Sequence, residues 1–152
     1  MCQLNVDDQY MKRALELARE AAEEGEVPVG AVIVRDGRIV GEGRNRREVA
    51  GNALAHAEVE AIDAACRELN GWQLVGCTLY VTLEPCPMCT GAIINSRIQR
   101  VVIGAMNPKA GSCGSIVNLF ELPYNHHPEL ICGVLCDECS ALLKAFFKRL
   151  RG

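Results

Sequence analysis

A chain of 152 residues, 49% hydrophobic and 23% charged, is long enough for one domain with a stable core. No apolar run has the length that crosses a bilayer, and a net charge of -3 does not indicate a nucleic-acid binder. The nine cysteines, an odd number, follow a start that lacks a signal-peptide layout, which favours a reduced compartment over a disulfide framework. We therefore expect a single cytoplasmic domain over residues 1–152, without membrane contact.

The first part of the chain predicts a helix followed by a β-hairpin. The Asp7-Asp8 pair offers N-cap residues, and Gly25 is a natural helix stop. Residues 28–34 read as a mostly buried strand, and Asp36-Gly37 is a strong hairpin signal before a returning strand. The apolar residues of the helix recur on one face: Met11, Ala14, Leu15, Ala18, Ala21 and Ala22.

The middle of the chain predicts a loop, a helix, a strand and a further helix. Residues 43–54 read as the loop, and a helix follows from about His56 to Asn70-Gly71. Residues 78–83 are apolar and β-branched enough for a central strand. Pro85 and Pro87 end that strand, and Pro87 suits the first turn of a third helix.

The last part predicts two strands and a terminal helix. Residues 100–104 and 130–134 read as strands, separated by a Gly-rich loop over 107–114 and an irregular stretch. The helix shows an apolar stripe of Leu142, Leu143, Phe146, Phe147 and Leu150. A helix, a hairpin and then alternating helices and strands predict a three-layer α/β/α domain, with its site beyond the strand ends at helix N-termini.

Two short motifs predict a metal site at such helix N-termini. Cys86 and Cys89 are three residues apart on an expected first helical turn, where the helix dipole favours thiolates. His56 opens the other helix. Two thiolates and an imidazole select zinc and leave a fourth position open for water, which is the catalytic arrangement. Glu58 lies two residues after His56, within reach of that water, and suits a proton shuttle.

The simpler interpretations of these residues are ordinary ones. A lone histidine at a helix start is more often a cap, a helical glutamate is usually solvated, and Cys-x-x-Cys is common in a cysteine-rich chain. The combination of both motifs in this context favours zinc. A closed, non-enzymatic zinc module would need Cys66 or Cys77 as fourth ligand, but Cys77 lies about 20 Å from Cys86 along an extended strand. Cys136 and Cys139 could hold a second metal, although two semi-buried thiols are the stronger interpretation.

The chain resembles the bacterial tRNA-specific adenosine deaminase family, within the cytidine-deaminase-like fold, which has a mixed five-stranded sheet with helices on both faces. The His56-Ala57-Glu58 and Pro85-Cys86-Pro87-Met88-Cys89 motifs mark the wider zinc-deaminase superfamily. The more specific likeness lies in Val27-Pro28-Val29-Gly30 and in the tail with Phe146-Phe147. The chain departs from the family's usual residues at Leu54, Ile103 and Asn107.

The resemblance implies a zinc-dependent hydrolase that converts adenosine to inosine at the wobble position (34) of a tRNA anticodon stem-loop. One zinc ion per subunit would be held by His56, Cys86 and Cys89, and zinc hydroxide would attack C6 with Glu58 as acid and base. Val29, Asn45 and the Ala57 backbone would contact the base, and the enzyme would be a homodimer.

The alternative function is zinc-dependent deamination of a free base or nucleoside of the guanine or cytosine type. The basic residues bear on this choice, because a small neutral substrate needs no phosphate contacts. Two clusters could bind RNA phosphates or could be ordinary solvated charge: Arg44, Arg46 and Arg47, and Lys144, Lys148 and Arg151. His126 and His127 are expected in a loop.

Overall fold

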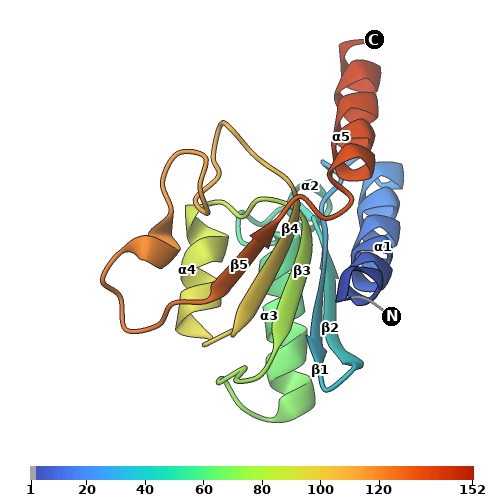
Figure 1. The fold of residues 1–152 in the computed structure, drawn as a ribbon. Coiled ribbons are helices and arrows are strands. Elements are labelled where there is room, and N and C mark those ends of the chain that lie inside the picture. The colour runs from blue at the N-terminus through green and yellow to red at the C-terminus, as the bar shows by residue number, and fades with distance from the viewer. Residues whose placement is uncertain (1–2) are drawn as a thin grey trace.

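The computed structural model describes residues 3–152. Five strands form one mixed sheet in the order β2-β1-β3-β4-β5 (Figure 1). The β1–β2 and β1–β3 pairs are antiparallel, whereas β3–β4 and β4–β5 are parallel. The predicted sheet is confirmed, and its central strand has the predicted bounds. The strands are β1 (Gly30–Arg35), β2 (Arg38–Arg44), β3 (Thr78–Leu83), β4 (Arg100–Ala105) and β5 (Glu129–Cys132).

Helices cover both faces of the sheet and complete the predicted three layers (Figure 1). Residues of α1 and α5 pack in one apolar cluster with Val32, Tyr80 and Val102, while those of α3 and α4 pack in another. Alternate residues of β3 belong to different clusters, because successive side chains of a strand point to opposite faces. The helices are α1 (Gln3–Glu23), α2 (Arg47–Ala50), α3 (Ala57–Leu69), α4 (Pro87–Asn95) and α5 (Cys136–Arg151), with a short 3-10 helix η1 (Leu119–Glu121).

Two glycines of β2 let α3 lie directly on the sheet. A Cβ atom at Gly41 would overlap the carbonyl oxygen of Ala61, and one at Gly43 would overlap that of Ala57. The facing residues Ala57, Ala61 and Ala65 are themselves fully buried. This backbone-to-backbone approach fixes the start of α3, where His56 and Glu58 lie.

We expect Gly43→Ala to destabilise the protein by about 2 kcal/mol, because the added methyl group overpacks the contact with α3. Gly91→Ala is the matched control, since a Cβ there meets nothing within 4 Å and alanine favours a helix interior. Urea unfolding of both variants measures the difference. Equal stability of Gly43→Ala and the wild type would contradict the close packing.

The predicted cap at the start of α1 is wrong. The helix is already formed at Gln3, and Asp7 is a buried residue in its interior. Its carboxylate accepts hydrogen bonds from the Tyr80 hydroxyl at 2.8 Å and from the Arg100 guanidinium at 2.8 and 3.0 Å. Burial alone would raise the pKa of Asp7, but these hydrogen bonds hold it below its usual value. Asp7 therefore ties α1 to the sheet rather than capping the helix.

Other boundaries differ modestly from the predicted ones. The expected loop over residues 43–54 contains the end of β2 and the short helix α2, while the last strand begins at Glu129. The C-terminal part of α5 stands clear of the sheet (Figure 1), so Phe147 and Leu150 of its apolar stripe are exposed. None of the helices described over residues 3–152 combines the length and apolar character needed to cross a membrane.

Candidate metal centre and catalytic pocket

The metal-site residues lie where two helices begin at one edge of the sheet. β2 and β3 run in the same direction, because each is antiparallel to β1. The segments that follow them therefore start at the same sheet edge, where His56 is the N-cap residue of α3 and Cys86 that of α4. Pro87 occupies the first position of α4, as predicted, and Cys89 lies in its first turn.

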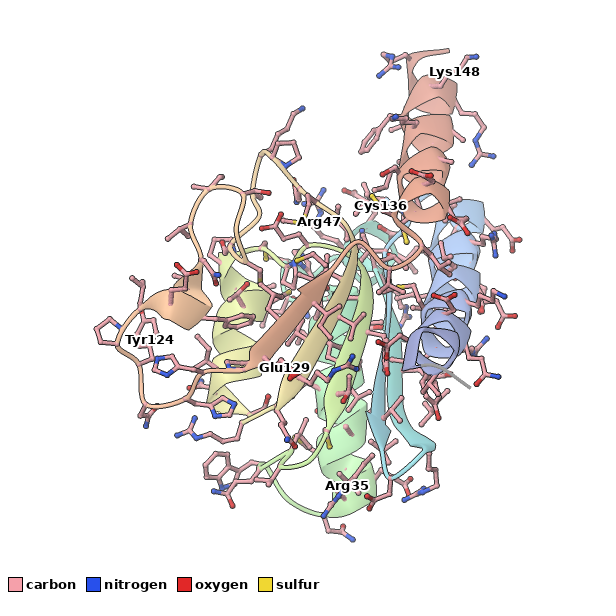
Figure 2. The ribbon with its side chains drawn as sticks, in the orientation of Figure 1. Arg35, Arg47, Tyr124, Glu129, Cys136 and Lys148 are labelled. Carbon is pink, nitrogen blue, oxygen red and sulfur yellow. The ribbon has the colours of Figure 1, made fainter. Side chains whose placement is uncertain are left out.

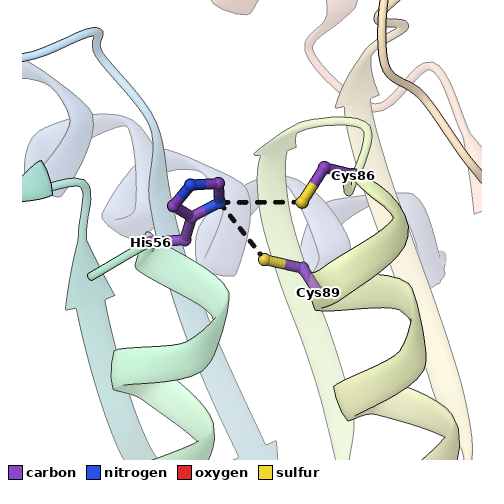
Figure 3. A group of neighbouring side chains, drawn as sticks. All are labelled: His56, Cys86 and Cys89. Atoms are coloured by element: carbon purple, nitrogen blue, oxygen red, sulfur yellow. Dashed lines mark hydrogen bonds between the residues drawn. The ribbon is translucent and has the colours of Figure 1, made fainter. Parts of the chain in front are cut away.

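The three side chains converge on a common point (Figure 3). Nδ1 of His56 lies 3.7 Å from Sγ of Cys86 and 3.4 Å from Sγ of Cys89, and all three ligand atoms lie within 4.8 Å of one another. Tetrahedral zinc with ordinary Zn–N and Zn–S lengths separates N from S by about 3.6 Å. The donor atoms therefore already have the spacing of a zinc ligand set.

The ionisation of the three groups is linked. The pKa of the Cys86 thiol is lowered to about 4, chiefly by its hydrogen bond with Cys89 and, despite burial, also by His56. The pKa of Cys89 is raised by the same hydrogen bond and by burial, and that of His56 is raised by Cys86. The hydrogen bond between the two thiols therefore favours ionisation of Cys86 and disfavours that of Cys89.

A cavity of about 230 Å³ opens beside this group, and Glu58 forms part of its wall together with His56 and Cys86. The Glu58 side chain is only 4% exposed, and burial raises the pKa of its carboxyl group to about 7. A carboxyl group with a pKa near neutrality can both accept and donate a proton during one reaction. The structure thus brings Glu58 and the three predicted ligands together.

The three predicted base contacts, Val29, Asn45 and Ala57, also line this cavity. Asn45 is held in place at both ends of its amide: Nδ2 donates to the Val27 carbonyl at 3.1 Å, and Oδ1 accepts from the Arg47 backbone at 3.1 Å. One Nδ2 hydrogen remains free for a further acceptor. Asn45 therefore has a fixed orientation and spare hydrogen-bonding capacity.

Sequence analysis did not assign the other cavity-lining residues to a substrate pocket: Val27, Arg47, Leu83, Glu84, Asn107 and Ala110. Arg47 is presented by α2, whose backbone amides at Glu48 and Val49 donate to the buried carboxylate of Glu26. A buried, acceptor-only side chain that binds helix amides is a strong local anchor. Glu26 thereby holds the segment that carries Arg47.

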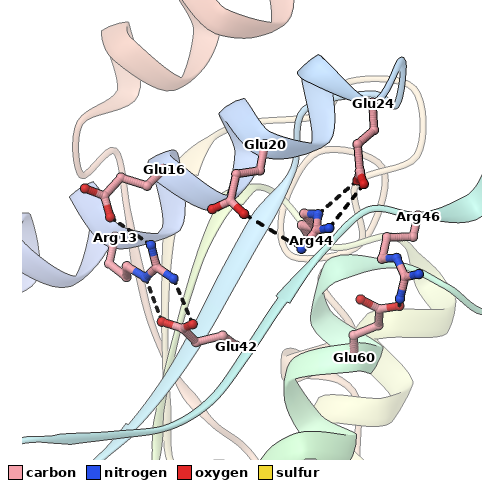
Figure 4. Close-up of polar contacts among 8 residues, drawn as sticks. All are labelled: Arg13, Glu16, Glu20, Glu24, Glu42, Arg44, Arg46 and Glu60. Carbon is pink, nitrogen blue, oxygen red and sulfur yellow. Dashed lines mark hydrogen bonds and ion pairs between the residues drawn. The ribbon is translucent and has the colours of Figure 1, made fainter. Parts of the chain in front are cut away.

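The arginine cluster divides into different roles. Arg44 makes two hydrogen bonds to Glu24 and lies 3.9 Å from Glu20, and Arg46 lies 3.6 Å from Glu60 (Figure 4). Arg44 therefore ties the end of β2 to α1 and to the turn after it, a structural role that neither interpretation of the cluster predicted. Arg47 alone of the three reaches the cavity wall, with its side chain 54% exposed.

The other cysteines and histidines of residues 3–152 lie outside the ligand group. Neither Cys66 nor the buried Cys77 joins it as a fourth ligand. Over residues 3–152, His56, Cys86 and Cys89 are the one group of three or more potential metal ligands, so Cys136 and Cys139 form no second site there. Nε2 of His126 lies 2.6 Å from the Ile98 carbonyl, and Nε2 of His127 lies 2.8 Å from that of Leu122.

The domain has three α/β/α layers, a His/Cys/Cys group at two helix N-termini and a buried glutamate beside that group. This combination is characteristic of hydrolytic deaminases. The MafB19-like deaminase family model matches residues 5–151. The chain is 51% identical to the tRNA-specific adenosine deaminase of Bacillus subtilis over 146 residues, covering 95% of this chain and 91% of that one. It belongs to the family of tRNA-specific adenosine deaminases, as the resemblance predicted.

Solved structures give the same result. A structure from a study of A-to-I editing by tRNA:A34 deaminases superposes with a TM-score of 0.86 at 43% identity, covering 89% of this chain and 99% of that chain. A guanine deaminase from Nitrosomonas europaea gives a TM-score of 0.77 at 26% identity, covering 91% and 83%. The cytidine-deaminase-like fold is thereby confirmed, and the tRNA:A34 deaminase is the more similar of these two.

Proposed function

We propose that this protein hydrolytically deaminates adenosine to inosine at the wobble position (34) of a tRNA anticodon stem-loop. The observation that carries the proposal is the cavity in which buried Glu58 adjoins the His56, Cys86 and Cys89 group. The substrate follows from the relatives, since both the Bacillus subtilis protein and the more similar solved structure are tRNA adenosine deaminases by name.

His56, Cys86 and Cys89 would hold one zinc ion per subunit. The spacing of their donor atoms supports this assignment, as does their chemistry, because sulfur and imidazole prefer zinc over magnesium or calcium. Bound zinc supplies a water molecule whose pKa is lowered to about 7. Two of these three side chains, His56 and Cys86, also line the cavity, so a metal ion held by them would border the substrate space.

Glu58 would act as the catalytic acid and base. Its carboxylate would accept the two protons of the attacking water in turn. It would deliver one to ring nitrogen N1 of the adenine and the other to the departing amino group, so that water and adenosine become inosine and ammonia. The raised pKa of Glu58 supports both halves of this transfer near neutral pH.

The base would enter the cavity between apolar and polar contacts. Val29 supplies an apolar surface, the fixed amide of Asn45 has a free donor, and Ala57 presents its backbone beside the metal ligand His56. A deaminase that acts within a nucleic acid must take its target base out of the stack into such a pocket. These three residues would therefore orient the adenine for attack at C6.

The RNA around the base would contact cationic side chains. Arg47 at the cavity and Lys148 on α5 lie toward the same end of the molecule, whereas Arg35 lies at the other end (Figure 2). Lys144, Lys148 and Arg151 are exposed on α5 and are available for phosphates. Homodimer formation and a cytoplasmic location stay predictions, the first of which light scattering of the purified protein would test.

We expect zinc affinity to fall as the pH drops below neutrality. Each proton that zinc binding displaces contributes about a tenfold loss of affinity per pH unit. Cys89, whose pKa is raised, must lose its proton to bind zinc, and the raised pKa of His56 adds competition as the pH falls. Competition with a chelating dye between pH 6 and 8 measures the slope. A pH-independent affinity would contradict thiolate ligation.

The test of the proposed function is ammonia release by the zinc-loaded protein on parallel substrates. These are an anticodon stem-loop with adenosine at position 34, the same loop with guanosine there, and free adenosine, guanine and cytosine. Activity confined to the adenosine-34 loop is expected. Activity only on free guanine or cytosine would be consistent with the zinc chemistry but would overturn the tRNA assignment. Guanine is included because the fold is also similar to that of a guanine deaminase.

A further inference from the structure

Glu84 is a buried carboxylate with a complete set of neutral donors. It is 1% exposed and lies at the end of β3, two residues before Cys86. Its Oε1 atom accepts from the Asn107 backbone at 2.9 Å, and its Oε2 atom accepts from the backbones of Cys113 and Ser115, each at 3.0 Å. The Ser115 hydroxyl donates a fourth hydrogen bond. Burying a carboxylate is costly unless its oxygens are bonded in this way.

All four donors belong to a single loop, residues 107–115, which has no helix or strand of its own. Gly111 packs so closely on Glu84 that a Cβ atom there would overlap the carboxyl group. The neighbouring Pro85 carbonyl accepts a further hydrogen bond from the Ser112 backbone at 2.9 Å. Two consecutive residues that lead into the Cys86 turn therefore hold the loop against the end of β3.

This loop supplies part of the cavity wall, because Asn107 and Ala110 both line the cavity beside His56 and Glu58. Asn107 is fixed from two sides: its backbone donates to Glu84, and its Oδ1 atom accepts from the Lys109 and Ala110 backbones at 3.2 and 3.3 Å. The Glu84 side chain thus joins this part of the cavity wall to the turn that carries Cys86.

We propose that Glu84 is a positioning residue that sets substrate fit by holding the wall formed by residues 107–110 in register with the Cys86 turn. The inference rests on the proposed function and adds to it a residue that neither ligates the metal nor transfers a proton. Glu84 itself borders the cavity, but the loop donates to both of its oxygens, so its effect on the substrate comes through the position of the wall.

The test is Glu84→Gln, which keeps the shape of the side chain but turns one acceptor into a donor that faces backbone N–H groups. We expect KM for the adenosine-34 stem-loop to rise by about tenfold or more, as displacement of a contact surface weakens alignment. Zinc content should match the wild type, and kcat at saturation should remain within about threefold, because the acid/base and the ligands are untouched.

Asp7→Asn is the matched control for mere loss of stability. Asp7 is also a buried carboxylate with hydrogen-bonded partners, but it lies in α1 on the other face of the sheet. Both variants should unfold at lower urea concentrations, and only Glu84→Gln should raise KM. An unchanged KM in Glu84→Gln, or an equal rise in Asp7→Asn, would overturn the proposal.

Amide hydrogen exchange tests the role of Glu84 without depending on the proposed function. In Glu84→Gln, exchange of residues 107–115 should accelerate relative to α3, and unchanged exchange there would overturn the proposal without any substrate. If the wild type releases no ammonia from any RNA loop, the proposed function fails, whereas the exchange experiment still decides whether Glu84 holds the wall. Should Glu84→Gln fail to fold, Ser115→Ala removes one of the four donors, and it must raise both KM and loop exchange.

Discussion

Glu58→Ala is expected to lower kcat on the adenosine-34 stem-loop by about 10²- to 10⁴-fold, which is the contribution of a positioned acid and base. The loss should appear almost entirely in kcat, because the carboxyl group is required for proton transfer and not for contact with the RNA. Single-turnover kinetics with zinc-loaded protein measures it. The zinc content of the variant should equal that of the wild type, since Glu58 lies outside the ligand group.

The stability of this variant gives an independent check. Burial raises the pKa of Glu58 to about 7, so the unfolded chain, with its ordinary carboxyl pKa, ionises first as the pH rises. The buried group therefore opposes folding above that lower pKa, fully so once the pH exceeds about 7. Between pH 5 and 8, the metal-free wild type should therefore lose stability relative to metal-free Glu58→Ala, as urea unfolding at the two pH values would measure. A variant that loses zinc would show instead that Glu58 is a ligand.

Cys86→Ala is expected to abolish stoichiometric zinc binding and, with it, activity. A metal ion that binds only the folded chain adds about 4 kcal/mol to the free energy of unfolding at a concentration about 1,000 times its Kd. The variant should lose that increment. Urea unfolding with and without a chelator separates the two contributions, because the difference between variant and wild type should shrink sharply once the metal is removed.

Cys77→Ala is the control for loss of a cysteine as such. Cys77 is fully buried yet lies outside the ligand group, so its alanine variant should keep one zinc ion per subunit. Loss of zinc from Cys77→Ala would revive the closed, four-ligand module and with it a non-enzymatic function. Equal zinc binding by Cys86→Ala and the wild type would contradict the ligand assignment.

The parts of this protein that are predictable from sequence are those governed by local rules. The bounds of β3 follow from a short apolar, β-branched run, and the start of α4 follows from Pro87. The ligand group is predictable because His56, Cys86 and Cys89 each sit at a helix start that the chain marks clearly. Their meeting follows from strand direction, which brings two helix N-termini to one sheet edge.

The parts that sequence alone missed depend on partners far along the chain. Asp7 is of a residue type that often caps helices, but its partner Arg100 is 93 residues away in the sequence. Glu84 precedes a recognisable motif, yet its function is visible only once residues 107–115 fold back on it. Arg44 resembles Arg46 and Arg47 in the sequence, and only the fold shows that it pairs with Glu24 in the turn after α1. Local patterns contain no information on such pairings.

The most direct test of the whole account is to react the zinc-loaded wild type with the adenosine-34 stem-loop in ¹⁸O-labelled water. Hydrolytic deamination predicts inosine at position 34 that carries the label at C6, with one ammonia released per inosine formed and both products reduced to trace amounts in Glu58→Ala over the same time. Unlabelled inosine, or ammonia without inosine at position 34, would contradict hydrolytic deamination in this pocket.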